Sequence, residues 1–232
     1  MENKKSIIWS YTKGEFVVFD HYYFSKLYNF LLNNYNLYIP TAFDDIFNYN
    51  FDMLVFNYPE KEFENYEISK ILDLFYKGKL ILFLSYYNNE DNSSQICNGV
   101  LNQVGININY DEVIDKINNI DNDEYLLVTS KVSDLLNKGV NKILLPCSSS
   151  ISVIKKINDL DYLDLVLSEN GETLVKGVFN TSGGGILAFG TCVFWDNFSL
   201  LKLDNMNFVD NLFSLVNLNK GGLYGRSQDF VR

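Results

Sequence analysis

Histidine is the scarcest reactive residue in this sequence: the chain has one, His21, among 232 residues. General acid–base catalysis and transition-metal binding use histidine more than most other side chains, so both have little to work with here. The three cysteines, Cys97, Cys147 and Cys192, are odd in number and widely spaced, which fits reduced thiols rather than a disulfide framework or a zinc site. We therefore predict no metal site and no cofactor.

Basic residues and long apolar runs are also in short supply. The chain has 19 Lys and Arg against 29 Asp and Glu, a net charge of −10, which argues against binding to nucleic acid or an anionic membrane. No apolar run approaches the ~20 residues of a membrane span, and no signal-type apolar segment follows the first residues. We expect a cytoplasmic protein that binds no nucleic acid and has no membrane span. The identity of a protein or small-molecule partner, and homo-oligomerisation, stay open.

Apolar and aromatic residues are abundant, at 47% and 16% of the chain, so there is enough apolar surface for a large core. The stretch Leu80 to Leu84 is apolar without alternation, which is typical of a strand that is covered on both faces. Such a strand belongs in the middle of a parallel sheet with helices on each face.

Further apolar runs, each separated from the next by a helical pattern or a loop, complete the picture. We predict that four strands lie parallel in one sheet: Phe16–Asp20, Asp52–Asn57, Leu80–Leu84 and Ile186–Phe189. Apolar residues at helical spacing predict the helices, with their stripes beginning at Phe24, Ile68, Cys97 and Val209.

The predicted fold class is thus α/β, a three-layer α/β/α sandwich with a mainly parallel central sheet. We expect a single domain over residues 1–218 and a loosely held tail over residues 219–232. Residues 106–176 show short strands and loops; they either extend the edge of the sheet or form a subdomain.

Four segments carry a resemblance to a known family. They are Phe16–His21, Asp52–Pro59 with Gly78–Leu84, Leu101–Val113, and Gly184–Gly190 followed by Trp195–Asn197 and Asp204–Asn205. In this order they resemble the class I glutamine amidotransferase-like (flavodoxin-like) domains of intraflagellar-transport-type and gliding or ABC-transport auxiliary proteins. The resemblance implies a flavodoxin-like fold and a binding or scaffolding role, because such domains mostly lack a demonstrated activity. Lys79 stands where the family has a second glycine, and Gly190–Cys192 where an acidic residue is common.

Candidate ligand-binding residues follow from the expected sheet, because parallel α/β sheets bind ligands beyond the carboxyl ends of their strands. Each candidate also has a structural interpretation, as a hydrogen-bonded strand end, a packed tryptophan or a capping aspartate. The candidates are Asp20, His21, Ser85, Tyr86, Asn88, Trp195, Asp196 and Asn197.

The sequence predicts no catalytic residues. True amidotransferases carry their cysteine on a tight elbow flanked by small residues, whereas Ser85 is flanked by Leu84 and Tyr86. The prediction is a non-catalytic domain that binds a partner protein or a small ligand. One alternative is a hydrolase that uses Ser85 or Cys192 with His21, which requires a hydrogen bond between them. A second, a sugar-binding or accessory module, rests on the 16 Tyr and 18 Phe alone.

Overall fold

Residues 4–217 of the computed structural model are described below. The predicted tail, residues 219–232, lies outside the described residues, and the single domain over residues 1–218 stays a prediction.

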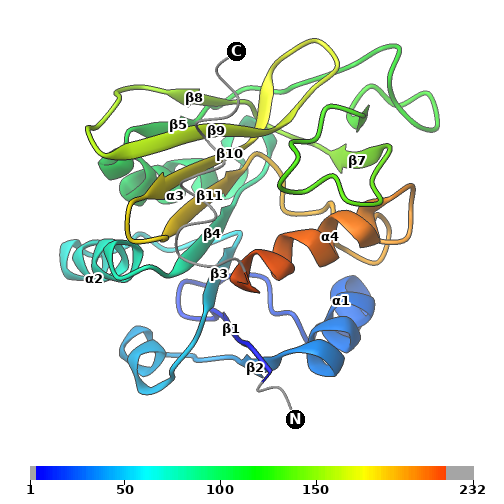
Figure 1. Cartoon of the computed structure of the whole chain (residues 1–232). Coiled ribbons are helices and arrows are strands. Elements are labelled where there is room, and N and C mark those ends of the chain that lie inside the picture. The colour runs from blue at the N-terminus through cyan, green and yellow to red at the C-terminus, as the bar shows by residue number, and fades with distance from the viewer. Residues whose placement is uncertain (1–3, 218–232) are drawn as a thin grey trace.

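The strands form one large sheet and two small ones (Figure 1). The strands are β1 (Ser6–Trp9), β2 (Asn36–Tyr38), β3 (Met53–Asn57), β4 (Leu80–Leu84), β5 (Ile106–Ile108), β6 (Leu126–Thr129), β7 (Ile143–Pro146), β8 (Ile151–Val153), β9 (Leu160–Leu167), β10 (Thr173–Asn180) and β11 (Gly185–Phe189). The helices are α1 (His21–Asn34), α2 (Asn65–Tyr76), α3 (Ser93–Leu101) and α4 (Asn205–Ser214), with 3-10 segments at Phe43–Asn48, Tyr87–Asn92, Asn102–Val104 and Leu215–Asn217.

The large sheet has the strand order β2-β1-β3-β4-β11-β10-β9. The first five strands are parallel, and β10 runs antiparallel to both β11 and β9. Strand β4 is central: Leu82 pairs with Val55 on one side and Leu187 on the other, and every residue of the strand is buried. The mainly parallel sheet confirms the predicted fold class.

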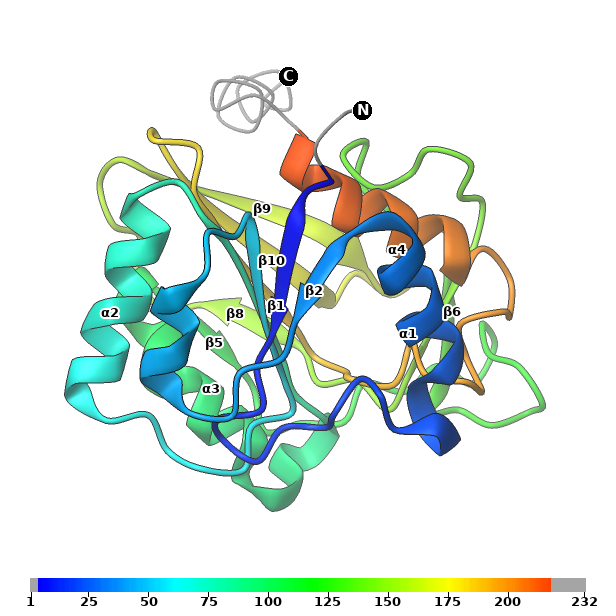
Figure 2. The same cartoon turned by 90° about the horizontal axis from the view of Figure 1, so that it is seen from below.

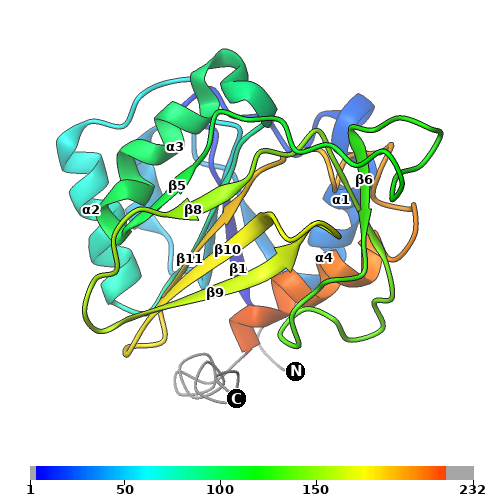
Figure 3. The ribbon, with the colours of Figure 1, turned by 90° about the horizontal axis from the view of Figure 1, so that it is seen from above.

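Two layers of helices cover this sheet (Figure 2). Helices α1 and α4 pack on one face, together with the hairpin of β6 and β7. Helices α2 and α3 pack on the other, where Figure 3 also shows β5 and β8. Residues 106–176 thus contribute to two parts of the fold. Strand β9 and the first half of β10 extend the edge of the sheet, and the shorter strands pack onto its two faces.

The predicted strand Phe16–Asp20 is wrong. The first strand is β1, whose Ile7, Ile8 and Trp9 are fully buried between β2 and β3. In the later apolar run only Val18 enters the core, while Phe16 and Phe19 are 37% and 48% exposed. The run is a loop across the carboxyl ends of the strands: the Phe16 N–H donates to the carbonyl of Asn57 at the end of β3, and Asp20 is the N-cap of α1.

Candidate functional site

The carboxyl ends of β1, β3, β4 and β11 meet at one edge of the sheet, since these strands are parallel. Ser10, Tyr58, Ser85 and Gly190 are the first residues beyond them. Ligand sites of open α/β sheets lie at this edge, so the side chains that gather there are the first candidates.

A pocket of about 270 Å³ opens at this edge, between the strand ends and the first turn of α1. We call it the carboxyl-edge pocket. It is lined by Phe16, Tyr23, Phe24, Tyr58, Tyr86, Glu90, Asp91, Cys192, Val193 and Asp196. Aromatic rings and carboxylates therefore dominate its wall.

The rings of the wall are in mutual contact. Phe16 stacks on Tyr58, with centroids 4.6 Å apart and planes 8° from parallel, and Tyr86 meets Tyr58 edge-on at 6.2 Å. The Tyr58 hydroxyl donates to Asp91 Oδ2 at 2.9 Å, which fixes this carboxylate beside the rings. Packed rings of this kind form a wall that need not be built when a ligand arrives.

The environment of the pocket disfavours negative charge. Burial, followed by the hydrogen bond to Asp91 and its charge, raises the pKa of Tyr58. Burial also raises the pKa of Asp196, and burial with the neighbouring Asp196 charge raises the pKa of the Cys192 thiol well above its ordinary value. Perturbed groups that gather in one hollow are a mark of functional sites.

Strained backbone is concentrated at the same edge. Tyr58 and Cys147 have φ of +63° and +50°, and Asn88, Asn89, Asp91 and Asn92 lie between +51° and +61°. Asn and Asp tolerate this left-handed region better than other residues, so the Asn-Asn-Glu-Asp-Asn run suits its path. Tyr58 precedes a proline, which makes the conformation more costly, and such strain clusters at ligand sites.

Two buried polar side chains behind the pocket have no hydrogen-bond partner among the described residues. They are Asn57, which precedes Tyr58, and the indole of Trp195, which precedes Asp196. Both side chains are fully buried and neither lines the pocket, so a ligand there does not reach them.

Tyr86 and Asp196 are the predicted ligand residues that line this pocket. Asp196 also caps the segment after it, because its Oδ1 accepts from the backbone N–H groups of Phe198 and Ser199 at 3.0 and 2.8 Å. Asn88 lies on the strained loop, where its backbone N–H donates to Asp111 O at 2.9 Å.

Asp20, His21, Asn197 and Trp195 hold the structure around the pocket instead of lining it. Asp20 is the N-cap of α1, and Oδ1 accepts from the N–H groups of Tyr22 and Tyr23. His21 is the exposed first residue of that helix, not a strand end. Asn197 donates to the carbonyls of His21 and Tyr22 and so ties the loop after β11 to α1. Trp195 is fully buried and stacks with Phe194 and Phe213.

The geometry offers no support to the hydrolase alternative. The Ser85 hydroxyl is fully buried and pairs with the hydroxyls of Ser93 and Ser94 at 3.0 and 2.6 Å. Cys192 is 1% exposed, and its raised pKa keeps the thiol protonated. No hydrogen bond links either group to the imidazole of His21 within residues 4–217. Over the same residues there is no group of three His, Cys, Asp or Glu side chains that could hold a metal ion, and no helix is long and apolar enough to cross a membrane.

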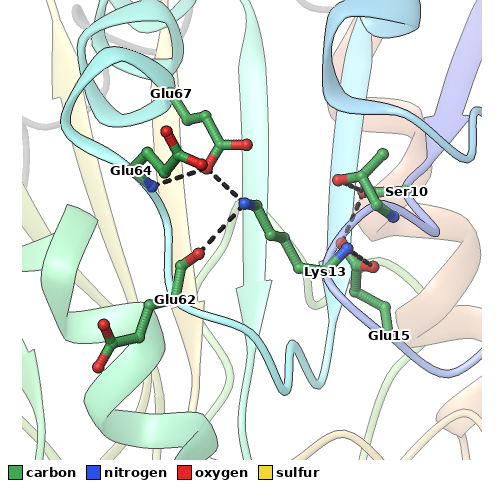
Figure 4. A network of polar contacts seen from close by, with 7 residues as sticks. Ser10, Lys13, Glu15, Glu62, Glu64 and Glu67 are labelled. Atoms are coloured by element: carbon green, nitrogen blue, oxygen red, sulfur yellow. Dashed lines mark hydrogen bonds and ion pairs between the residues drawn. The ribbon is translucent and has the colours of Figure 1, made fainter.

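A buried charge network beside the pocket escaped prediction (Figure 4). The Lys13 ammonium forms an ion pair with Glu67 and donates to the carbonyl of Glu62 at 3.1 Å. The Glu67 carboxylate also accepts from the Glu64 N–H, closing the capping box of α2. The network anchors the loop between β1 and α1, which supplies Phe16 to the pocket. The sequence contains a signal for part of this network: Glu64 and Glu67 are three residues apart just before the apolar stripe of α2, which is the spacing of a capping box.

Glu15 forms the other end of this network and is 2% exposed. Its carboxylate accepts from the Ser10 hydroxyl and the Lys13 N–H, both at 2.6 Å. Burial nevertheless outweighs these hydrogen bonds and raises the pKa of Glu15 above its ordinary value of 4.5.

This shift gives a pH-dependent prediction for Glu15→Gln. A folded-state pKa above the unfolded one means that the folded protein binds the proton more tightly, so this group's stabilisation is present at low pH and lost as pH rises past its folded pKa. Glutamine cannot ionise and avoids that loss. We expect the variant to be more stable relative to wild type at about pH 7.5 than at about pH 4, that is, the difference in free energy of unfolding (variant minus wild type) rises with pH in urea melts. The exposed Glu60→Gln is the control, and a difference that shrinks toward high pH would contradict the assignment.

A second hollow, of about 560 Å³, runs along β9 beside residues 131–135. Larger though it is, it lies along an edge strand, away from the strained backbone and the meeting strand ends. We therefore take the carboxyl-edge pocket as the candidate site.

No family model matches this sequence. An uncharacterised protein of Aquifex aeolicus (strain VF5) is 34% identical over 231 residues, which cover 92% of this chain and 94% of that protein. Among solved structures, the mmIFT52 N-terminal domain aligns with a TM-score of 0.78 and 16% identity over 92% of this chain and 98% of that one. This likeness confirms the intraflagellar-transport-type fold inferred from the sequence. A glutamine amidotransferase from Thermotoga maritima aligns at a TM-score of 0.44 and 10% identity, over 98% of this chain and 91% of that one, which is too low to argue from.

Proposed function

We propose that this chain is a non-catalytic binding domain. The premise is that it belongs to the family of the uncharacterised Aquifex aeolicus protein and has the fold of the mmIFT52 N-terminal domain. Its ligand, a small molecule or a side chain of a partner protein, enters the carboxyl-edge pocket. The observation that carries the proposal is the pocket itself, a preformed aromatic and acidic hollow at the ligand-binding edge of the sheet. Over the part of the chain that the structure describes, neither Ser85 nor Cys192 hydrogen-bonds to His21.

The surroundings of the pocket support binding rather than chemistry. The Lys13 network holds the loop that carries Phe16, and the hydrogen bond from Tyr58 holds Asp91, so the wall is organised before a ligand binds.

Exposed aromatic residues near the mouth favour a protein partner as the source of the ligand. The segment from residue 11 to residue 23 carries five large aromatics that are at least 37% exposed: Tyr11, Phe16, Phe19, Tyr22 and Tyr23. Exposed aromatics concentrated in one segment mark interaction surfaces more often than isolated ones do.

Filling the pocket tests this function. Val193 lines the pocket and is half-buried, so Val193→Trp should occupy the space that a ligand needs. We expect ligand-observed NMR with a panel of small cations, anions, sugars and neutral aromatics to find at least one class that binds wild type, and the variant to weaken it about tenfold or more.

The control is Leu163→Trp, which fills the hollow along β9 and should leave that binding unchanged. Circular dichroism establishes that both variants fold. Binding by no class of the panel, or binding that survives Val193→Trp, would overturn the proposed function.

A further inference from the structure

We infer that the carboxyl-edge pocket selects an organic cation, an alkylammonium or guanidinium group, an inference that rests on the proposed function and names its ligand class. The pocket joins two features that each favour such a group, faces of aromatic rings and carboxylates, in a space of about 270 Å³.

The aromatic part comes from five rings on three separate segments. Phe16 precedes α1, Tyr23 and Phe24 belong to its first turns, and Tyr58 and Tyr86 follow β3 and β4. The face of an aromatic ring carries partial negative charge and attracts a cation within about 6 Å of its centre. Hydrated metal ions gain less from such walls than alkylated ammonium groups, which shed their water easily.

The charged part is one-sided. Glu90, Asp91 and Asp196 line the pocket, and among residues 4–217 no Lys or Arg lines it. Lys26 on α1 lies close enough to influence Asp196, but its ammonium donates to the carbonyl of Asn197 at 2.9 Å, outside the pocket wall. An anionic ligand would meet three carboxylates here, whereas a cation would offset them.

The pKa shifts of two residues in the pocket wall agree with a cationic ligand. Beyond burial, the charges of Asp91 and Glu90 contribute to the raised pKa of Tyr58, and the charge of Asp196 to that of Cys192. These groups therefore sense a negative potential inside the pocket, and a bound cation would relieve it.

Size narrows the choice further. Pockets for drug-sized ligands run from about 300 to 1,000 Å³, so this one suits a head group or a single side chain. The two sources of this chemistry are a free alkylammonium compound and a Lys or Arg side chain of a partner protein.

The decisive comparison uses two probes of the same shape. Choline carries a quaternary ammonium, and 3,3-dimethylbutan-1-ol has a carbon in its place and no charge. We expect NMR titration of the full chain to give choline a dissociation constant about tenfold lower or more. Equal binding of the two would overturn the cation inference and leave the binding function standing. If neither probe bound, and no other class of the NMR panel bound either, the proposed binding function would be overturned as well.

Matched substitutions assign the effect to the wall. Asp91→Asn keeps the shape and an acceptor for Tyr58 but removes the charge, and Tyr86→Leu removes one ring. Each should weaken choline binding about fivefold or more, while the exposed Asp73→Asn on α2 should not. Unchanged binding in both pocket variants would contradict the assignment.

A third arm distinguishes the two sources. Short peptides with a central Lys, Arg or trimethyl-Lys are compared with choline and with the same peptides carrying norleucine. Tighter binding of a cationic peptide than of choline identifies a partner's side chain, and the reverse identifies a small molecule. A norleucine peptide that binds as well as the cationic ones would overturn the inference.

Discussion

Replacing Lys13 by methionine is expected to lower the free energy of unfolding by about 3–5 kcal/mol, the cost of leaving a buried charge without its partner. The Lys13 and Glu67 side chains are 10% and 4% exposed, so water does not compensate for the lost ammonium. The ammonium also lies 5.5 Å from the centroid of Phe63. The variant thus loses an ion pair, a hydrogen bond to Glu62 and a cation–π contact together.

Urea denaturation of Lys13→Met beside the exposed Lys61→Met measures the effect. The double variant Lys13→Met/Glu67→Gln removes the stranded charge but keeps an acceptor for the Glu64 N–H. We expect it to recover about half of the loss or more, as buried pairs replaced together often do. A loss below about 1 kcal/mol in the single variant would show that the network contributes little to stability.

The Leu82→Ala substitution should cost about 2–5 kcal/mol, because it opens a cavity in the central strand. Leu82 is fully buried, pairs with strands on both sides and packs into the core under α1 and α4. Helices on both faces leave the site little freedom to collapse around the missing atoms.

Leu201→Ala is the matched control, since Leu201 is 64% exposed and should lose no more than about 0.5 kcal/mol. Both values come from urea melts at equal protein concentration. If Leu82→Ala lost less than about 1 kcal/mol, β4 would not be the central, tightly packed strand described here.

Continuous apolar runs and helical stripes were enough to predict most of the fold. The runs at residues 52–57, 80–84 and 186–189 are parallel neighbours, and Ile71, Cys97 and Phe213 lie on buried helix faces. A strand that is buried on both faces is apolar along its whole length, so a short window of sequence is enough to recognise it.

The same local signal failed at residues 16–20. An apolar run at the rim of a pocket looks like an apolar run in a strand, and Phe16–Phe19 has four consecutive apolar residues where Ile7–Trp9 has three. What separates them is pairing: β1 has strands on both sides, whereas Phe16 follows a loop held by Lys13 and Glu67. Partners 30 or more residues away in the sequence decide this, and no short window along the chain contains them.

The candidate site also has one part that the sequence predicts and another that depends on the tertiary structure. The sequence by itself determined the sheet and hence the edge at which we predicted ligand residues; of these, Tyr86 and Asp196 line the carboxyl-edge pocket. Only the tertiary structure decided which side chains enter the pocket. It turned Ser85 into the interior, made Asp20 and Asn197 ties to α1, and brought Phe16, Tyr58 and Asp91 into one wall. The physical reason is that strand order follows from the burial of each segment, while the direction of a side chain beyond a strand end depends on φ and on distant contacts.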